Sequence, residues 1–226
     1  MLIKVDESDR VLGPISKLDG HLSGAITDGI THRAFSVFMF SRVDCNLLIQ
    51  KRASTKIVFP RQWANTCCSH PLYIPDEMDT NQNMGVKRAA SKRVHAELGL
   101  ENIPPESFSF KDKILYRQMS PGGVFGESEV DYILFRLSDK PDQIPHDADE
   151  VEETRWISPG PAGDRTKNLR DFLNSETKRG FPATPWFSLM VKEPACLEKW
   201  WSDLIEDPQS FLASQFDSHS IRSFLQ

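Results

Sequence analysis

The sequence has few cysteines and no excess of basic residues. Four cysteines in 226 residues are too few for a disulfide scaffold, and two of them, Cys67 and Cys68, are adjacent, which is awkward for an ordinary bridge. We therefore expect reduced thiols that are free to do chemistry. A formal net charge of -5 argues against general nucleic-acid binding, because such binding calls for a basic surplus.

Long apolar runs are also missing. None approaches the roughly 20 residues that a membrane-spanning helix needs, and residues 1–9 carry acids in place of the apolar centre of a signal peptide. These absences predict a cytoplasmic protein without a membrane partner. With 39% hydrophobic and 26% charged residues, the composition is that of an ordinary globular protein, and the length suits one domain.

Strand and helix patterns alternate along the chain, which predicts a mixed α/β domain. A stripe of apolar residues every four positions predicts a helix over residues 84–98, and Gly99 supplies its stop. Further helices are expected at 167–178 and along the C-terminal stripe from Leu197 to Ile205. The expected strands are 2–5, 11–13, 32–40, 47–50, 108–117, 130–137 and 154–157, with 17–31 as a polar stretch and 139–153 as a solvated acidic connection.

The most informative segment is Asn65-Thr66-Cys67-Cys68-Ser69-His70-Pro71. A thiol two residues from an imidazole can be a nucleophile with its base, a pair of metal ligands, or a proton donor and acceptor tuned by nearby charge. The structural alternative is that both cysteines are small buried side chains beside a capping histidine.

Further groups provide carboxylates and imidazoles. Glu127 and Glu129 lead into a strand and point to the same face, so they can share one cation or one proton. Paired surface glutamates and lone structural histidines are common. Together with His21, His32 and His70, however, the pair offers three imidazoles and two carboxylates, a set that suits zinc, manganese or magnesium.

A cationic group completes the candidates. Lys17, Arg52 and Lys56 can clamp a diphosphate, since arginine gives bidentate hydrogen bonds and lysine adds a point charge. The alternative is a solvated basic face. Glu97 follows Arg93 by four residues, so it is either half of a helix ion pair or a carboxylate that holds a phosphate-bound magnesium.

With these residues the sequence resembles the type 1 isopentenyl-diphosphate delta-isomerases, a branch of the Nudix fold, from about residue 1 to residue 186. The resemblance implies a mixed β-sheet sandwiched between helices, with a C-terminal amphipathic helical extension. It implies one domain over 1–226, with a core at 32–160 and a mostly helical part at 161–226. The matching segments are His32-Arg33-Ala34-Phe35-Ser36, 51–60, 65–71, Ala96-Glu97-Leu98-Gly99, Gly126-Glu127-Ser128-Glu129 and Ala183-Thr184-Pro185-Trp186.

The resemblance also implies a role for each matching position. The catalytic cysteine falls on Cys68, the catalytic glutamate on Glu129 with Tyr116 near it, and Cys67 is a spectator. One Mg²⁺ would accompany the diphosphate, and one divalent ion, Mg²⁺, Mn²⁺ or Zn²⁺, would occupy the His/Glu set. The implied substrate-binding residues are Lys17, Arg52, Lys56, Ser69, Arg93 and Trp186, and the implied metal ligands are His21, His32, His70, Glu127 and Glu129, with Glu97 for the second ion.

The implied activity is the interconversion of isopentenyl and dimethylallyl diphosphate, in isoprenoid biosynthesis, by moving a proton across an allyl unit. We hypothesise that Glu129 and Tyr116 deliver the proton on one face, that a Cys68 thiolate removes one on the other, and that the indole of Trp186 stabilises the carbocation. The expected partner is a small diphosphate substrate, and we expect a monomer.

Two departures from the patterns matter. Arg61 stands where the isomerases usually have glycine. Of the Nudix hydrolase signature, residues 92–99 keep only Glu97 and Gly99, which argues against pyrophosphate cleavage. A Nudix diphosphohydrolase and a non-catalytic homologue acting as an interaction protein are the alternatives.

Overall fold

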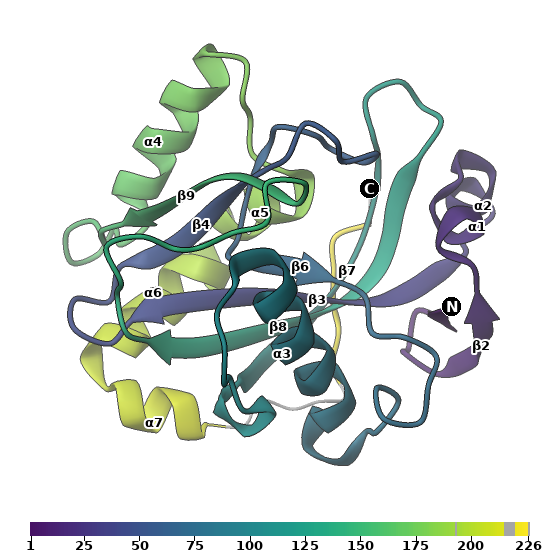
Figure 1. The fold of residues 1–226 in the computed structure, drawn as a ribbon, viewed down its shortest axis with the longest axis horizontal. Coiled ribbons are helices and arrows are strands. Elements are labelled where there is room, and N and C mark those ends of the chain that lie inside the picture. Colours follow the sequence, from purple (N-terminus) through teal and green to yellow (C-terminus); the bar gives the residue numbers. More distant parts are fainter. Residues whose placement is uncertain (193, 215–219, 226) are drawn as a thin grey trace.

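The computed structural model describes residues 1–192, 194–214 and 220–225, and a mixed β-sheet runs through its centre (Figure 1). The strand order is β10-β7-β8-β3-β1-β2, while β4 pairs with β3, β5 and β9, and β6 pairs with β3. The strands are β1 Leu2–Val5, β2 Val11–Ile15, β3 Thr31–Ser41, β4 Leu47–Arg52, β5 Trp63–Ala64, β6 Cys67–Ser69, β7 Ser109–Met119, β8 Gly126–Ser138, β9 Val151–Ile157 and β10 Arg222–Ser223. The α-helices are α1 Lys17–His21, α2 Ser23–Thr27, α3 Met84–Leu98, α4 Lys167–Lys178, α5 Pro185–Lys192, α6 Lys199–Glu206 and α7 Pro208–Ala213.

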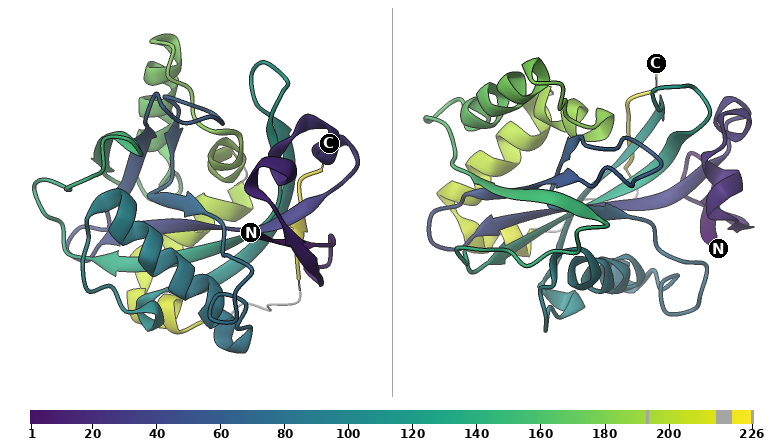
Figure 2. Two further views of the ribbon diagram at one scale, coloured as in Figure 1. Left: turned by 45° about the vertical axis from the view of Figure 1, so that its right-hand side comes forward. Right: turned by 45° about the horizontal axis from the view of Figure 1, so that its top comes forward.

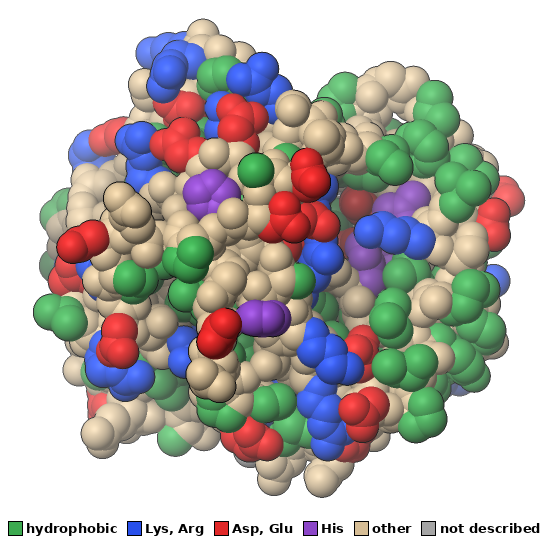
Figure 3. Space-filling model, viewed as in Figure 1, with side chains coloured by type: hydrophobic (Ala, Val, Ile, Leu, Met, Phe, Trp, Pro, Cys, Tyr) green, Lys and Arg blue, Asp and Glu red, His purple; other side chains and the backbone are tan. Residues whose placement is uncertain are grey.

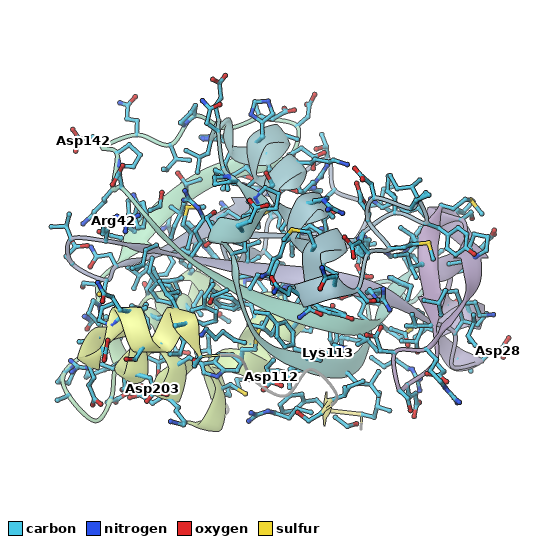
Figure 4. The ribbon with its side chains drawn as sticks, turned by 90° about the horizontal axis from the view of Figure 1, so that it is seen from below. Asp28, Arg42, Asp112, Lys113, Asp142 and Asp203 are labelled. Atoms are coloured by element: carbon cyan, nitrogen blue, oxygen red, sulfur yellow. The ribbon has the colours of Figure 1, made fainter. Side chains whose placement is uncertain are left out.

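Helices cover both faces of this sheet, as Figures 2 and 4 show from different sides. On one face, α3 packs its apolar stripe into a core cluster that includes Val86 and Leu98. On the other face, the C-terminal helices bury Trp200, Trp201 and Phe211 in a second cluster. The expected mixed sheet sandwiched between helices is therefore confirmed. None of the helices in the described residues is long and apolar enough to cross a membrane.

Helices cover both faces of the central strands, and the side chains of these strands are correspondingly apolar. β3 is buried along its whole length and pairs in parallel with β8, which in turn pairs antiparallel with β7. Successive side chains of β3 alternate between the two clusters, with Phe38 and Phe40 in one and Val37 and Met39 in the other. This alternation fixes which face of the sheet each site residue occupies.

Several expected elements are confirmed and several needed correction. The helices predicted at 84–98 and 167–178 have those bounds, and Gly99 ends the first in the left-handed region at φ 60°. The polar stretch at 17–31 contains two five-residue helices, too short to show a period in the sequence. In the C-terminal stripe, a turn of π-helix at Pro194–Glu198 precedes α6, so the regular helix starts at Lys199.

The N-terminal hairpin is fastened to the sheet through one buried carboxylate. Asp9, in the turn between β1 and β2, accepts hydrogen bonds from Arg33 Nε at 2.8 Å and from Lys113 Nζ at 2.7 Å. Lys113 projects from β7 and is labelled in Figure 4. Because α1 follows this hairpin directly, the fastening also helps to place the first site residues, Lys17 and His21.

Candidate active site

The sequence candidates meet in a pocket of about 780 Å³ beside β3 and β8. Figure 3 shows a hollow on this side of the molecule, with histidine, acidic and basic side chains inside and hydrophobic ones around it. Two predicted residues, His32 and Glu97, are not part of the lining and lie deeper. The predicted residues that line the pocket are Lys17, His21, Arg52, Lys56, Cys68, Ser69, His70, Arg93, Tyr116, Glu127, Glu129 and Trp186.

Three imidazoles and two carboxylates form a compact cluster at one end. One ligand atom from each of His21, His32, His70, Glu127 and Glu129 lies within 4.8 Å of all the others. His21 Nε2 is 3.0 Å from Glu127 Oε2, and His70 Nε2 is 2.7 Å from Glu129 Oε1. The two glutamates share a face of β8 because strand side chains alternate. The grouping proposed from the sequence is therefore present in the structure.

The donor set of this cluster fits a divalent cation. His21 Nδ1–H donates to the Lys17 carbonyl at 2.6 Å, so Nε2 is the ring nitrogen that faces Glu127. Within the described residues, neither ring nitrogen of the fully buried His32 has a hydrogen-bond partner. An unpartnered buried polar atom costs about 1–3 kcal/mol. A metal ion bound through Nε2 would remove part of that cost.

The charges of the cluster are uneven. Burial alone would raise the pKa of Glu129, but the imidazoles of His32 and His70 beside it hold that pKa well below its usual value. For Glu127, burial and the negative charge of Glu129 raise the pKa. Burial lowers the pKa of His70 to about 3, so this ring is neutral near neutral pH, the form that binds a metal. Tyr116 donates its hydroxyl hydrogen to Glu129 Oε2.

The two adjacent cysteines face opposite sides of the sheet. Cys68 on β6 lies opposite Ser36 of β3 and lines the pocket, whereas Cys67 is fully buried in the cluster under α3. Burial raises the pKa of the Cys68 thiol to about 12, although the charge of Arg52 opposes this shift. Arg52 Nη1 donates to Cys68 Sγ at 3.7 Å. The resting form is therefore a thiol with a guanidinium ready to stabilise a thiolate.

Cations gather at another part of the pocket. Arg52 is oriented by hydrogen bonds to the carbonyls of Phe59 at 3.1 Å and Val58 at 2.9 Å. Lys17, Lys56 and Arg93 line the same pocket, and burial together with the positive charges of Arg93 and Lys56 lowers the pKa of Lys17. Arg61 does not line the pocket: it adopts φ 58°, a conformation that favours glycine, and packs over Phe181.

Trp186 contributes an apolar surface to the wall of the pocket. The indole is 4% exposed, lies at the start of α5, and donates its N–H to Asn65 Oδ1 at 3.0 Å. The Asn65 amide nitrogen in turn donates to the carbonyls of Val37 and Cys67. Sequence reasoning missed Asn65 as a positioning residue, although it belongs to the segment singled out for its cysteines.

Glu97 forms the ion pair with Arg93 that was one of its two expected roles, whereas Glu150 is placed differently from expectation. Glu97 is 1% exposed, and its carboxylate accepts hydrogen bonds from Arg93 Nε at 2.8 Å and Gln50 Nε2 at 3.1 Å, so it faces protein donors. Glu150 falls in the acidic stretch expected to be a solvated connection, yet it lines the pocket beside Lys56 and Arg93. No local pattern in the sequence distinguishes Glu150 from its acidic neighbours.

Comparison with known proteins identifies the family to which this fold belongs. The family model of the NUDIX domain matches residues 30–175. DR0079 from Deinococcus radiodurans shares the fold, with a TM-score of 0.51 and 16% identity over 87% of this chain and 98% of that one. A NUDIX hydrolase from Alicyclobacillus acidocaldarius has a TM-score of 0.50 and 12% identity, over 75% of this chain and 95% of that one. The chain is thus a Nudix-domain protein.

Curated relatives narrow this class. Isopentenyl-diphosphate Delta-isomerase 1 of Bos taurus is 38% identical over 206 residues, covering 90% of this chain and 85% of the relative. The corresponding isomerase of Gibberella zeae is 38% identical, covering 94% of this chain and 80% of the relative. That of Phaffia rhodozyma is 39% identical, covering 90% of this chain and 76% of the relative. The chain belongs to the isopentenyl-diphosphate delta-isomerase family.

Proposed function

We propose that this pocket interconverts isopentenyl and dimethylallyl diphosphate by proton transfer across the allyl unit. The observation that carries the assignment is the placement of Cys68 and Glu129. They come from β6 and β8, which both pair with β3, and both line the same pocket. Isomerisation of this kind needs one group that gives a proton and another that takes one, with the alkene between them.

The cationic side of the pocket would bind the diphosphate. Arg52, Lys56, Lys17 and Arg93 all line it, and Ser69 adds a hydroxyl. Their contribution is to hold the substrate so that the isoprene unit reaches the proton-transferring groups, which is catalysis by positioning. The volume of about 780 Å³ is within the usual range for sites that bind small molecules.

Other groups of the same pocket would perform the chemistry. Glu129 and the hydrogen-bonded Tyr116 form one proton-transferring unit, and Cys68 with Arg52 forms the other. In the free protein the thiol carries a proton and Glu129 is ionised. If Glu129 donates and Cys68 accepts, as hypothesised from the sequence, this is the state reached after isopentenyl diphosphate has been converted. Before the next turnover, Cys68 must lose its proton and Glu129 must regain one, by exchange with solvent.

Two further features support the proposal. The indole of Trp186 faces the same pocket and can stabilise a developing tertiary cation. His21, His32, His70, Glu127 and Glu129 would hold a divalent ion, which when bound would orient the Glu129 carboxylate and offset its negative charge. We propose Mg²⁺ with the diphosphate and Mg²⁺, Mn²⁺ or Zn²⁺ in the cluster. That the protein is a cytoplasmic monomer, with one domain over 1–226, stays a prediction.

Turnover in deuterated water tests the function. Isopentenyl diphosphate should acquire deuterium in the methyl group formed at its terminal carbon, without release of phosphate or pyrophosphate. Glu129→Gln should abolish this label, because an amide cannot supply the proton, while inorganic pyrophosphate should still bind through Arg52 and Lys56. Phosphate release without label uptake by the intact protein would instead establish a Nudix diphosphohydrolase.

A further inference from the structure

Glu150 occupies the cationic side of the pocket in a way that the proposed chemistry does not use. Its Oε2 accepts a hydrogen bond from Lys56 Nζ and forms an ion pair with Arg93 Nη2 at 2.7 Å. The same two cations also meet Glu97 Oε1, at 3.7 Å for Lys56 and 2.8 Å for Arg93. Two cations and two carboxylates therefore form a closed ring at the place where the diphosphate is expected.

The two carboxylates of this ring differ in accessibility. Glu97 has a side chain that is 1% exposed, lies outside the pocket lining, and is also bonded to Gln50. Glu150 lines the pocket and its side chain is 27% exposed. An anion that enters the pocket can therefore compete with Glu150 for Lys56 and Arg93 while Glu97 keeps its contacts.

The backbone holds Glu150 at this position. Its carbonyl accepts a hydrogen bond from Ala53 N–H at 3.1 Å, and its own N–H donates to the Asp147 carbonyl at 3.0 Å. Asp147 N–H in turn donates to the Glu97 carbonyl at the end of α3. The turn is thus tied both to the end of β4 and to α3, so the carboxylate is presented to the pocket by a fixed backbone.

We propose that Glu150 is a resident counter-anion of the pocket, which neutralises Lys56 and Arg93 in the free protein and is displaced by the substrate diphosphate. This inference rests on the proposed function, because it takes the cationic side as the diphosphate site. Without a compensating carboxylate, the cations that converge there would repel one another. Because an entering anion must displace the Glu150 carboxylate from Lys56 and Arg93, Glu150 lowers the affinity of the pocket for diphosphates.

Titration calorimetry with inorganic pyrophosphate, at one fixed magnesium concentration, tests the inference on the full-length protein. Glu150→Gln retains a hydrogen-bond acceptor but loses the charge, and should bind pyrophosphate about fivefold more tightly, the scale of one unit-charge contact in water. Glu150→Asp should stay close to the wild type. The matched control is Glu152→Gln on β9: Glu152 pairs with Lys51 and Arg61, does not line the pocket, and should change the affinity less than twofold.

Thermal unfolding separates displacement from a purely structural role. Glu150→Gln should lower Tm without pyrophosphate and recover most of the loss when pyrophosphate is saturating, because the added anion takes over the two cations. An equal loss of Tm with and without pyrophosphate, or equal or weaker pyrophosphate binding by Glu150→Gln, would refute the inference alone. If neither the wild type nor any variant binds pyrophosphate, the diphosphate pocket of the proposed function is refuted as well.

Discussion

Trp186 offers a sharp test of the site, because a second tryptophan in the same core is built in a similar way. Trp186 and Trp63 are both buried, at 4% and 0% exposure, and both belong to the cluster under the C-terminal helices. Each donates its indole N–H to a side-chain oxygen, Trp186 to Asn65 at 3.0 Å and Trp63 to Glu176 at 3.1 Å. Only Trp186 lines the pocket.

Substitution of either tryptophan should therefore lower stability, but only substitution of Trp186 should lower turnover. Replacing either residue by leucine removes a large buried ring and leaves an acceptor without its donor. We expect about 3–5 kcal/mol less unfolding free energy in each case. If the indole stabilises the cation by about 2 kcal/mol, Trp186→Leu should lower kcat about 30-fold, and Trp186→Phe about fivefold to tenfold, because phenylalanine keeps a weaker π face.

The assay compares kcat with the free energy of unfolding in denaturant, at a temperature where every variant is folded. Trp63→Leu should keep kcat within about twofold of the wild type despite its lost stability. Equal loss of kcat in Trp63→Leu and Trp186→Leu would show that the effect of Trp186 is structural. A Trp186→Leu variant with wild-type kcat would remove the indole from the mechanism.

Two further predictions concern the thiols and the metal. Cys68→Ala should abolish turnover with little change in Tm, and Cys67→Ala should retain substantial activity, as steady-state assays of both variants will show; the reverse result would mean that the wrong cysteine has been assigned. Removal of the metal by a chelator should inactivate the protein and lower its unfolding free energy by about 2.7 kcal/mol if the ion had been present at 100 times its Kd. Full activity in chelator, measured with metal analysis of the same sample, would exclude the ion from the mechanism.

How far the sequence predicts the molecule depends on the range of the interactions involved. α3 and α4 were predicted to the residue because the helical period and the stop at Gly99 are local signals. α1 and α2 were missed because five residues span little more than one turn. The strand at Cys67–Ser69 was missed for a similar reason: three residues show no alternation, and its pairing with β3 is a long-range contact.

In the site, too, local features were predicted from the sequence and long-range contacts were not. The sequence indicates the roles of Cys68, His70 and the Glu127/Glu129 pair through the resemblance to the isomerases, since residue types and spacing alone left a structural alternative open. It does not indicate that Glu150 turns toward Lys56, since that depends on a turn anchored to two other elements. The four-residue spacing does indicate the ion pair of Glu97 with Arg93, but nothing in the sequence indicates that Gln50 on β4 also donates to Glu97. Partners brought together only by folding were the ones missed.

The contrast with the Nudix hydrolases can be explained at α3. Relative to the hydrolase signature, this chain has Arg93 and Ala96 where glutamates are expected and keeps Glu97. In the structure Arg93 neutralises Glu97 and reaches into the pocket, so α3 presents a cation there in place of a carboxylate cluster. The pocket carboxylates that can bind a metal with the three histidines lie on β8 instead. A metal held there would be bound in part by Glu129, the proposed proton donor, on a different element from the one that carries the hydrolase signature.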